Sequence, residues 1–128
     1  MKPKVLIVEW ALPLHNFYRQ ALEEKVELHM ASTLEEGIEI FHQHSDFALI
    51  ATRIFLKSDG KKEQIGSMPF IEELRRSGFE GPILVIASMY CIDSEKLERA
   101  GATGGCQIDS APDEILCQIL CLLEMDEE

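Results

Sequence analysis

The sequence is poor in basic residues, has a single tryptophan and lacks long apolar runs. Its 128 residues carry 12 lysines and arginines against 23 aspartates and glutamates, a formal net charge of −11. A surface this negative repels phosphate backbones and anionic lipids, so we expect neither nucleic acid nor the membrane surface as a partner. No apolar run approaches the roughly 18–20 residues of a membrane helix. The N-terminus lacks the cleavage site of a signal peptide, and we expect a cytoplasmic protein.

Cysteine and histidine patterns typical of metal sites or disulfide frameworks are also missing. Four cysteines are present, at Cys91, Cys106, Cys117 and Cys121. Their spacing fits neither pattern, and we interpret them as small buried apolar residues in a reducing compartment. His42 and His44 lie two apart, a spacing that points them away from each other on a helix. We therefore expect no metal and no cofactor.

Short apolar runs indicate buried strands. Val5–Val8, Phe47–Ala51 and Ile83–Ala87 are apolar throughout, which predicts strands covered on both faces. Val26–Met30 alternates more and predicts an edge strand. A glycine-rich turn, GATGG, leads into a short strand near Cys106–Ile108.

Helical patterns fill the stretches between these strands. Pro13 suits the first turn of a first helix. Ser32 opens S-T-L-E, which predicts a capping box with Glu35. Gly78 marks the end of a third helix, and Asp93 suits the start of a short fourth one.

Strand and helix therefore alternate five times, which predicts a single α/β domain over residues 1–128, with a core at 4–123 and an acidic tail at 124–128. The predicted architecture is a doubly wound, parallel five-stranded sheet of order 2-1-3-4-5, with helices on both faces. Thr52–Gly66 shows no clear period and is predicted to be a long loop. Glu9 and Trp10 fall at the switch point between the first and third strands, where ligands bind in such sheets.

These segments resemble the receiver domain of bacterial response regulators, a CheY-like, flavodoxin-like fold, over residues 4–123. KVLIVE, DFALIA, GPILVIAS and GATGG match the family's strands and the turn before the fifth, and LEEGIEIF and MPFIEELRRSGF resemble its second and third helices. The resemblance implies a role in two-component, or phosphorelay, signal transduction.

The resemblance also implies phosphoryl transfer from a histidine kinase to an aspartate. That chemistry needs an acidic pair to hold Mg²⁺, together with a hydroxyl and a lysine. The corresponding positions here are Ala51 for the nucleophile, Glu9 and Trp10 for the acidic pair, Ala87 for the hydroxyl, Ile108 for the lysine and Gly105 for the switch aromatic. We therefore predict a pseudo-receiver that is not an enzyme, with a vestigial phosphorylation pocket and no catalytic residue.

Such a pocket needs filling rather than solvating. We predict that Trp10 plugs it, the alternative being a surface position against the first helix. Glu9 then needs a cationic partner, for which Arg53 and Lys57 are the candidates.

The expected function is a phosphorylation-independent module that binds a protein. The resemblance places the binding face on the fourth helix, fifth strand and fifth helix, roughly Asp93 to Glu124, and implies a kinase, a sibling domain or a second copy in a homodimer as partner. One alternative is a flavodoxin-like cofactor protein, although EWALPLH offers no phosphate-binding glycines or hydroxyls. Others are a receiver that uses Ser88 or Thr52 as acceptor, and a decayed module that folds and does little.

Overall fold

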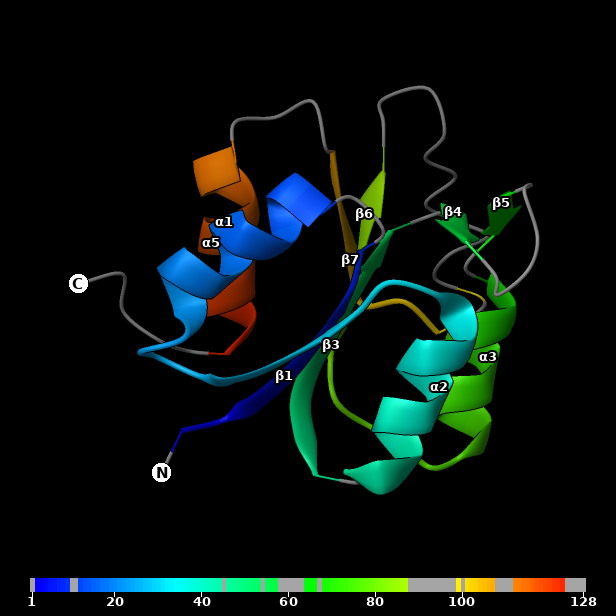
Figure 1. Ribbon diagram of the computed structural model, residues 1–128. Helices are drawn as coiled ribbons and strands as arrows, with labels where there is room; N and C mark the ends of the chain where they lie inside the picture. The colour runs from blue at the N-terminus through cyan, green and yellow to red at the C-terminus, as the bar shows by residue number, and fades with distance from the viewer. Residues whose placement is uncertain are drawn as a thin grey trace.

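The computed structural model describes residues 2–9, 12–44, 46–53, 55–57, 64–66, 68–87, 99, 101–107 and 112–123. A central sheet runs between two layers of helices (Figure 1). This is the layered α/β arrangement that the alternation of strand and helix patterns predicts.

Five parallel strands form the central sheet, in the order β2-β1-β3-β6-β7. Their bounds are β1 Lys4–Val8, β2 Glu27–Ala31, β3 Phe47–Arg53, β6 Ile83–Ala87 and β7 Gly104–Gln107. The predicted order and the edge position of the second strand are confirmed. Because the chain steps from β1 to β2 on one side and returns to β3 on the other, the switch point lies between β1 and β3.

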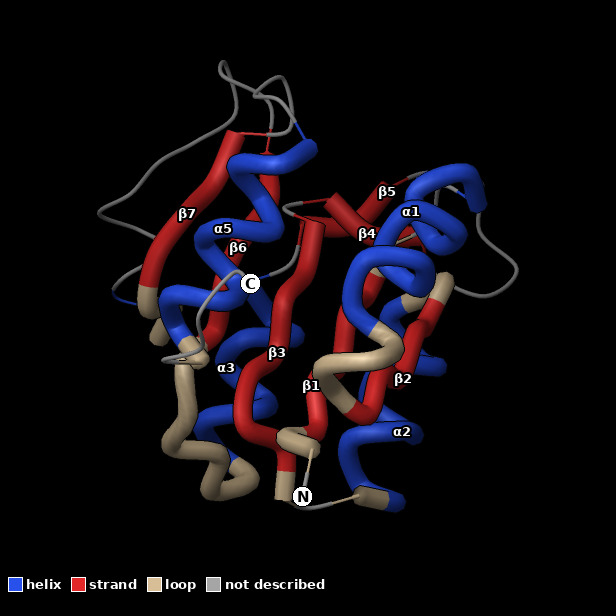
Figure 2. The backbone as a smooth tube through the Cα atoms, turned by 90° about the vertical axis from the view of Figure 1, so that its left-hand side faces the viewer, coloured by secondary structure: helices blue, strands red, loops and turns tan. Residues whose placement is uncertain are grey.

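Among the described residues, two pairs of helices cover the two faces of the sheet. α1 (Leu12–Leu22) and α5 (Pro112–Leu122) lie on one face, and α2 (Leu34–Gln43) and α3 (Met68–Arg76) on the other (Figures 1 and 2). The layers follow from the right-handed crossovers that join parallel strands. No helix within the described part of the chain is long and apolar enough to cross a membrane.

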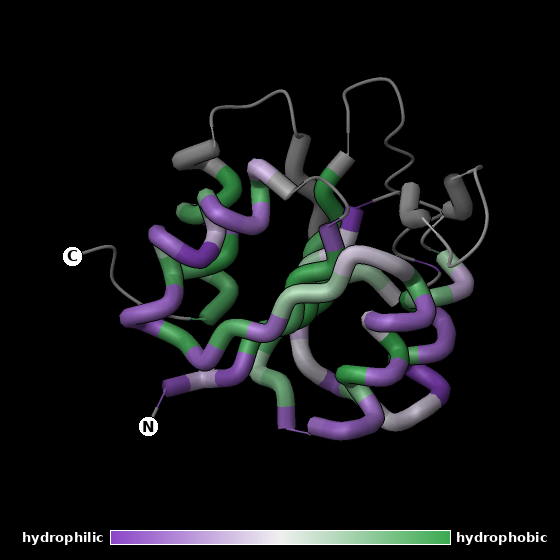
Figure 3. The backbone as a smooth tube through the Cα atoms, viewed as in Figure 1, coloured by the Kyte–Doolittle hydropathy of each residue, from purple (hydrophilic) through white to green (hydrophobic). Residues whose placement is uncertain are grey.

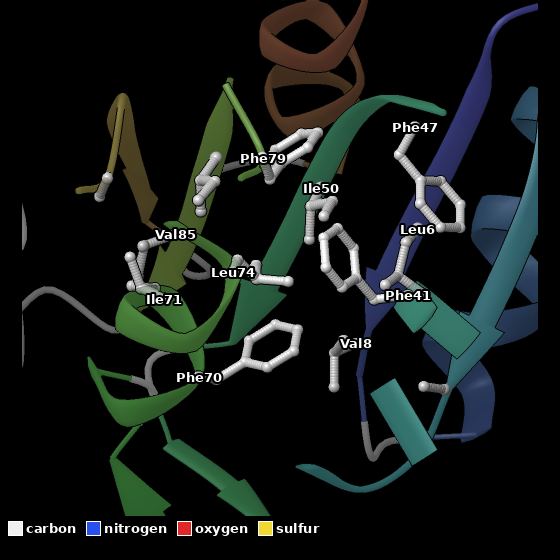
Figure 4. Packing of buried hydrophobic residues seen from close by; sticks show 13 residues of the cluster. Leu6, Val8, Phe41, Phe47, Ile50, Phe70, Ile71, Leu74, Phe79 and Val85 are labelled. Atoms are coloured by element: carbon white, nitrogen blue, oxygen red, sulfur yellow. The ribbon is translucent and has the colours of Figure 1, made fainter. Parts of the chain in front are cut away.

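Alternate residues of each strand enter different hydrophobic clusters. In β1, Leu6 and Val8 pack toward α2 and α3, whereas Val5 and Ile7 pack toward α1 and α5. Figure 3 shows the apolar strands between helices of mixed character, and Figure 4 the side chains that fill the α2–α3 side. Phe70, one of four phenylalanines in this cluster, has no exposed surface. Each such side chain stabilises the fold by roughly 1.5–3 kcal/mol.

The start of α2 differs by one residue from the predicted capping box. The N-cap is Thr33, with an extended backbone, and its hydroxyl accepts a hydrogen bond from the Glu36 N–H at 3.2 Å. The Glu36 carboxylate in turn accepts from the Ser32 N–H at 2.7 Å. The N-cap half of a capping box is therefore present and uses Thr33 and Glu36, whereas the Glu36 carboxylate bonds to the residue before the N-cap. The prediction of Ser32 and Glu35 is wrong.

The end of α3 matches the prediction at Gly78. Gly78 has a φ of +99°, a left-handed conformation that favours glycine. Its N–H donates to the Arg75 carbonyl at 3.1 Å, and the Phe79 N–H donates to the Leu74 carbonyl at 3.0 Å. These two bonds form a Schellman motif, which satisfies carbonyls left open at the helix end.

Arg75 connects this helix end to the starts of two strands. Its Nη1 donates to the Phe79 carbonyl at 2.9 Å and to the Gly81 carbonyl at 2.8 Å. Its Nε and Nη2 both donate to the Gly101 carbonyl, at 3.0 and 2.7 Å. Burial lowers the pKa of the Arg75 guanidinium from its ordinary value. The side chain therefore holds together the segments that lead into β6 and β7.

The predicted loop over Thr52–Gly66 is wrong in two respects. β3 continues to Arg53, and β4 (Phe55–Lys57) pairs with β5 (Gln64–Gly66) as an antiparallel ribbon. β7 also begins earlier than predicted, at Gly104. The helix predicted at Asp93 and the acidic tail lie outside the described residues.

Candidate functional site

The predicted site lies where the parallel strands end, at the upper edge of the sheet in Figure 1. Glu9 follows β1 directly, β3 ends at Arg53, and β6 ends at Ala87. In doubly wound sheets the crevice beyond the strand ends at the switch point is the usual place for ligands.

A buried ion pair occupies this edge. Arg53 Nη1 donates to Glu9 Oε1 at 3.1 Å. The Glu9 side chain has no exposed surface, and that of Arg53 is 17% exposed. The prediction that Glu9 needs a cationic partner is confirmed for Arg53, whereas the side chain of Lys57 lies outside the described part.

Strand register explains why Arg53 is the partner. Ile7 lies opposite Ala51, and Val8 lies opposite Thr52. The next residues along the two strands are Glu9 and Arg53, so they face each other across the strand pair. The sequence pattern that ends the third strand at Ala51 conceals this relation, because it places Arg53 in a loop.

The backbone N–H and carbonyl of Glu9 are also hydrogen-bonded. Its N–H donates to the carbonyl of Ala31, the last residue of β2, at 2.9 Å. Its carbonyl accepts a hydrogen bond from Nε2 of His15, a buried residue of α1. A carbonyl only accepts, so the His15 ring presents an N–H at Nε2. Glu9 is thus held by β2, by α1 and by β3.

The position predicted to correspond to the nucleophile is part of the apolar core. Ala51 is fully buried in the hydrophobic cluster on the α1–α5 side, together with Ile7 and Leu84. Its methyl group offers no oxygen. The neighbouring Thr52 is also fully buried, and its hydroxyl donates to the Arg53 carbonyl at 3.1 Å.

The other predicted site residues are only partly described. The backbone of Ala87 lies opposite Gln107, and Gly105 lies opposite Val85. Trp10 and Ile108 fall outside the described residues, so the prediction that Trp10 plugs the pocket stays a prediction.

The described residues do not fit the Mg²⁺ that the receiver resemblance implies. The Arg53 guanidinium already contacts the carboxylate that would bind the ion. A divalent cation placed about 4 Å from this group would be repelled by roughly 8 kcal/mol at an effective dielectric constant of about 20. The Glu9 carbonyl oxygen, another potential ligand, already accepts a hydrogen bond from His15. Mg²⁺ requires about six oxygen ligands, whereas this edge presents N–H donors to the oxygens of Glu9.

A second charged cluster lies at the opposite edge of the sheet and was missed from the sequence. Lys4 Nζ lies 2.8 Å from Asp46 Oδ1 and 3.9 Å from Glu27 Oε2, and His29 lies 2.9 Å from Glu27. The ring centroids of His29 and His44 are 4.4 Å apart. Both carboxylates are exposed, Asp46 pairs with the Lys4 ammonium, and Glu27 contacts Lys4 and the His29 ring, so the cluster has the character of a solvated surface.

The cysteine prediction holds only in part. Cys117 is half-buried, whereas Cys121 is exposed, so the prediction of a buried cysteine is wrong for Cys121. The side chains of Cys91 and Cys106 are not among those described.

Comparison of the sequence with protein-family models and with curated proteins gives no match. Solved structures do match. A CheY-like response regulator receiver domain protein from Methanospirillum hungatei is 20% identical, with a TM-score of 0.78 over 97% of this chain and 95% of that one. The Vibrio cholerae chemotaxis protein CheY4 is 18% identical, with a TM-score of 0.78 over 95% and 99%. A two-component response regulator from Clostridium difficile is 18% identical, with a TM-score of 0.77 over 96% and 97%. The chain therefore has the CheY-like receiver fold.

Proposed function

We propose that the chain is a receiver-like module of two-component signalling that acts by binding a protein and not by accepting a phosphoryl group. The fold likeness supports the receiver part of this proposal. The observation that carries the rest is the buried pair between Glu9 and Arg53.

Aspartyl phosphorylation needs a carboxylate nucleophile and a cation on the phosphoryl oxygens. At the nucleophile position Ala51 has no carboxylate and no exposed surface. The carboxylate at the end of β1 is bonded to Arg53. Both requirements are therefore unmet among the described residues, and signalling has to depend on the surface.

The outer side of α5 supports a protein partner. From Ile115 to its end at Leu122 the helix contains no charged residue, in a chain that is 27% charged. Ile115 and Ile119 are buried, whereas Gln118 and Cys121 are exposed. Depletion of charge is typical of the centre of protein interfaces. We propose this side of α5 as part of the surface that binds a kinase, a sibling domain or a second copy.

Incubation with acetyl phosphate and Mg²⁺ tests the loss of phosphoryl transfer. We expect the intact mass of the protein to stay unchanged, while a phosphorylatable receiver domain treated in parallel gains one phosphoryl group. A phosphoryl mass on any aspartate of this chain would contradict the proposal.

Charge placed on α5 tests the binding surface. Cys121→Asp should reduce retention of protein partners from native lysate, or lower the mass of a homodimer in light scattering. Gln43→Asp is the matched control, since it adds the same charge at an exposed position on α2, across the sheet. Equal retention and equal mass for both variants would remove α5 from the proposed surface.

A further inference from the structure

The Glu9 carboxylate is fully buried at an edge of the sheet where the fold ordinarily binds ligands. A buried carboxylate is tolerated only when a cation or hydrogen-bond donors compensate for its lost hydration. Here the compensating group belongs to the chain itself, the Arg53 guanidinium at 3.1 Å.

Arginine differs from a bound metal in that it is part of the chain and cannot dissociate, and its guanidinium is always charged in proteins. Arg53 also has little freedom of position. It is the last residue of β3, in register with Ile86 of β6, and its side chain is 17% exposed. The positive charge beside Glu9 is therefore permanent.

The backbone carbonyl oxygen of Glu9 also accepts a hydrogen bond. The His15 imidazole donates to its carbonyl, and the Glu9 N–H is engaged by Ala31. A divalent cation would have to displace N–H groups supplied by α1 and β3 before it reached these oxygens.

We infer that Arg53 takes the place of a divalent cation at this edge of the sheet and keeps the site in a single electrostatic state that does not respond to Mg²⁺. The inference rests on the proposed function, to which it adds a mechanism. A module with this device presents one constant surface to its partner, because no ion and no phosphoryl group alters the charge beside Glu9.

Binding of Mn²⁺, a paramagnetic substitute for Mg²⁺, to the full chain tests the inference by electron paramagnetic resonance. We expect wild type to show only weak binding to its acidic surface. Arg53→Ala should gain a site at least about tenfold tighter, and Glu9→Gln combined with Arg53→Ala should lose it again. Mg²⁺ should raise the thermal midpoint of Arg53→Ala and leave that of wild type unchanged.

Arg76→Ala is the matched control, because it makes the same change in net charge at a side chain that is 74% exposed and pairs with Glu73. Its Mn²⁺ binding should equal that of wild type. If Arg53→Ala fails to fold, Arg53→Gln replaces it in every arm.

Two results would overturn the inference. One is a Mn²⁺ site in wild type that Glu9→Gln removes, and the other is Mn²⁺ binding by Arg53→Ala no tighter than that of Arg76→Ala. Neither result bears on phosphoryl transfer, which the acetyl phosphate experiment measures separately. A phosphorylated wild type would refute the proposed function whatever the Mn²⁺ data show.

Discussion

Two arginines stabilise opposite ends of the parallel strands, one at the C-terminal ends and one at the N-terminal ends, and their contacts differ in chemistry. Arg53, at the ends of the parallel strands, neutralises a buried carboxylate through the contact with Glu9. Arg75, at the other edge, donates to the carbonyls of Phe79, Gly81 and Gly101, none of which carries a charge. The first arginine balances a charge, whereas the second ties loops together by the shape of its planar group.

The two arginines should respond differently to substitution of their partners. When one partner of a buried ion pair is removed, the loss of stability comes mainly from the charge left behind. Neutralising the second partner should therefore recover part of that loss. The loss of hydrogen bonds to three backbone carbonyls cannot be compensated in this way, because no side-chain substitution removes a backbone carbonyl. Loss of Arg53 should therefore be repairable from Glu9, whereas loss of Arg75 should not be repairable from any single partner.

The largest expected effect is that of Arg53→Ala. Removal of the guanidinium leaves a buried carboxylate without this cation, which should lower the free energy of unfolding by about 3–5 kcal/mol. Addition of Glu9→Gln should recover part of the loss, and Arg76→Ala should change stability by no more than about 0.5 kcal/mol. Urea unfolding at pH 7 measures all three variants. A double variant no more stable than Arg53→Ala would mean that charge is not the source of the loss.

Arg75→Ala should lower the free energy of unfolding by about 2–4 kcal/mol, somewhat less than Arg53→Ala, because water can reach part of the exposed carbonyl surface. The sharper test is substitution by lysine. Arg75→Lys should be about as unstable as Arg75→Ala, because an ammonium group cannot span three carbonyls. Arg53→Lys, in contrast, should retain much of the wild-type stability. The comparison between the two arginines would fail if both lysine variants lost the same fraction of stability in urea.

Two glycines near Arg75 should respond differently to alanine. A Cβ on Gly101, where φ is +121°, would lie 2.6 Å from Arg75 Cγ, whereas a Cβ on Gly78, where φ is +99°, would meet nothing within 4 Å. Gly78→Ala should cost about 1 kcal/mol from backbone strain alone. Gly101→Ala should cost more, because it also displaces Arg75. Equal thermal midpoints for the two variants would show that the arginine adapts freely.

The smallest effect should come from a third cation, Lys4, which is bonded to the exposed Asp46 at the lower edge. The hydrogen bond from Lys4 is the main cause that lowers the pKa of Asp46, and the bond to Asp46 is the main cause that raises the pKa of Lys4. A lowered carboxyl pKa adds stability that is present above the ordinary value of 3.8 and is lost as the pH falls below it.

Lys4→Met should therefore lower the stability of the fold slightly at pH 7. It should also make the urea midpoint less sensitive to acid below pH 3.8. The change at pH 7 should be within the small range of surface ion pairs. Asp46→Asn should give the same flattened acid profile. An unaltered profile in both variants would exclude this pair as a source of acid sensitivity.

The sequence predicted some features of the site and missed others for identifiable reasons. Glu9 was recognised as a carboxylate in need of a cation, with two candidates. Arg53 could not be chosen over Lys57, because Thr52 and Arg53 lack the apolar character that marked the rest of the third strand. The N-cap of α2 was predicted at Ser32, although Thr33 is also a good capping residue. Only the extended backbone at Thr33 decided it.

The sequence by itself determined the alternation of strand and helix, the strand order and the stop at Gly78. These depend on local periodicity, on the two-sided burial of apolar runs and on the conformational freedom of one residue type. Only the tertiary structure decided which cation meets Glu9 and which carbonyls Arg75 binds. Arg53 lies 44 residues from Glu9 along the chain, and the two meet only because packing of the whole sheet aligns β1 with β3. Neither contact leaves a periodic trace in the sequence, because each depends on strand register and loop position and not on the residues beside it.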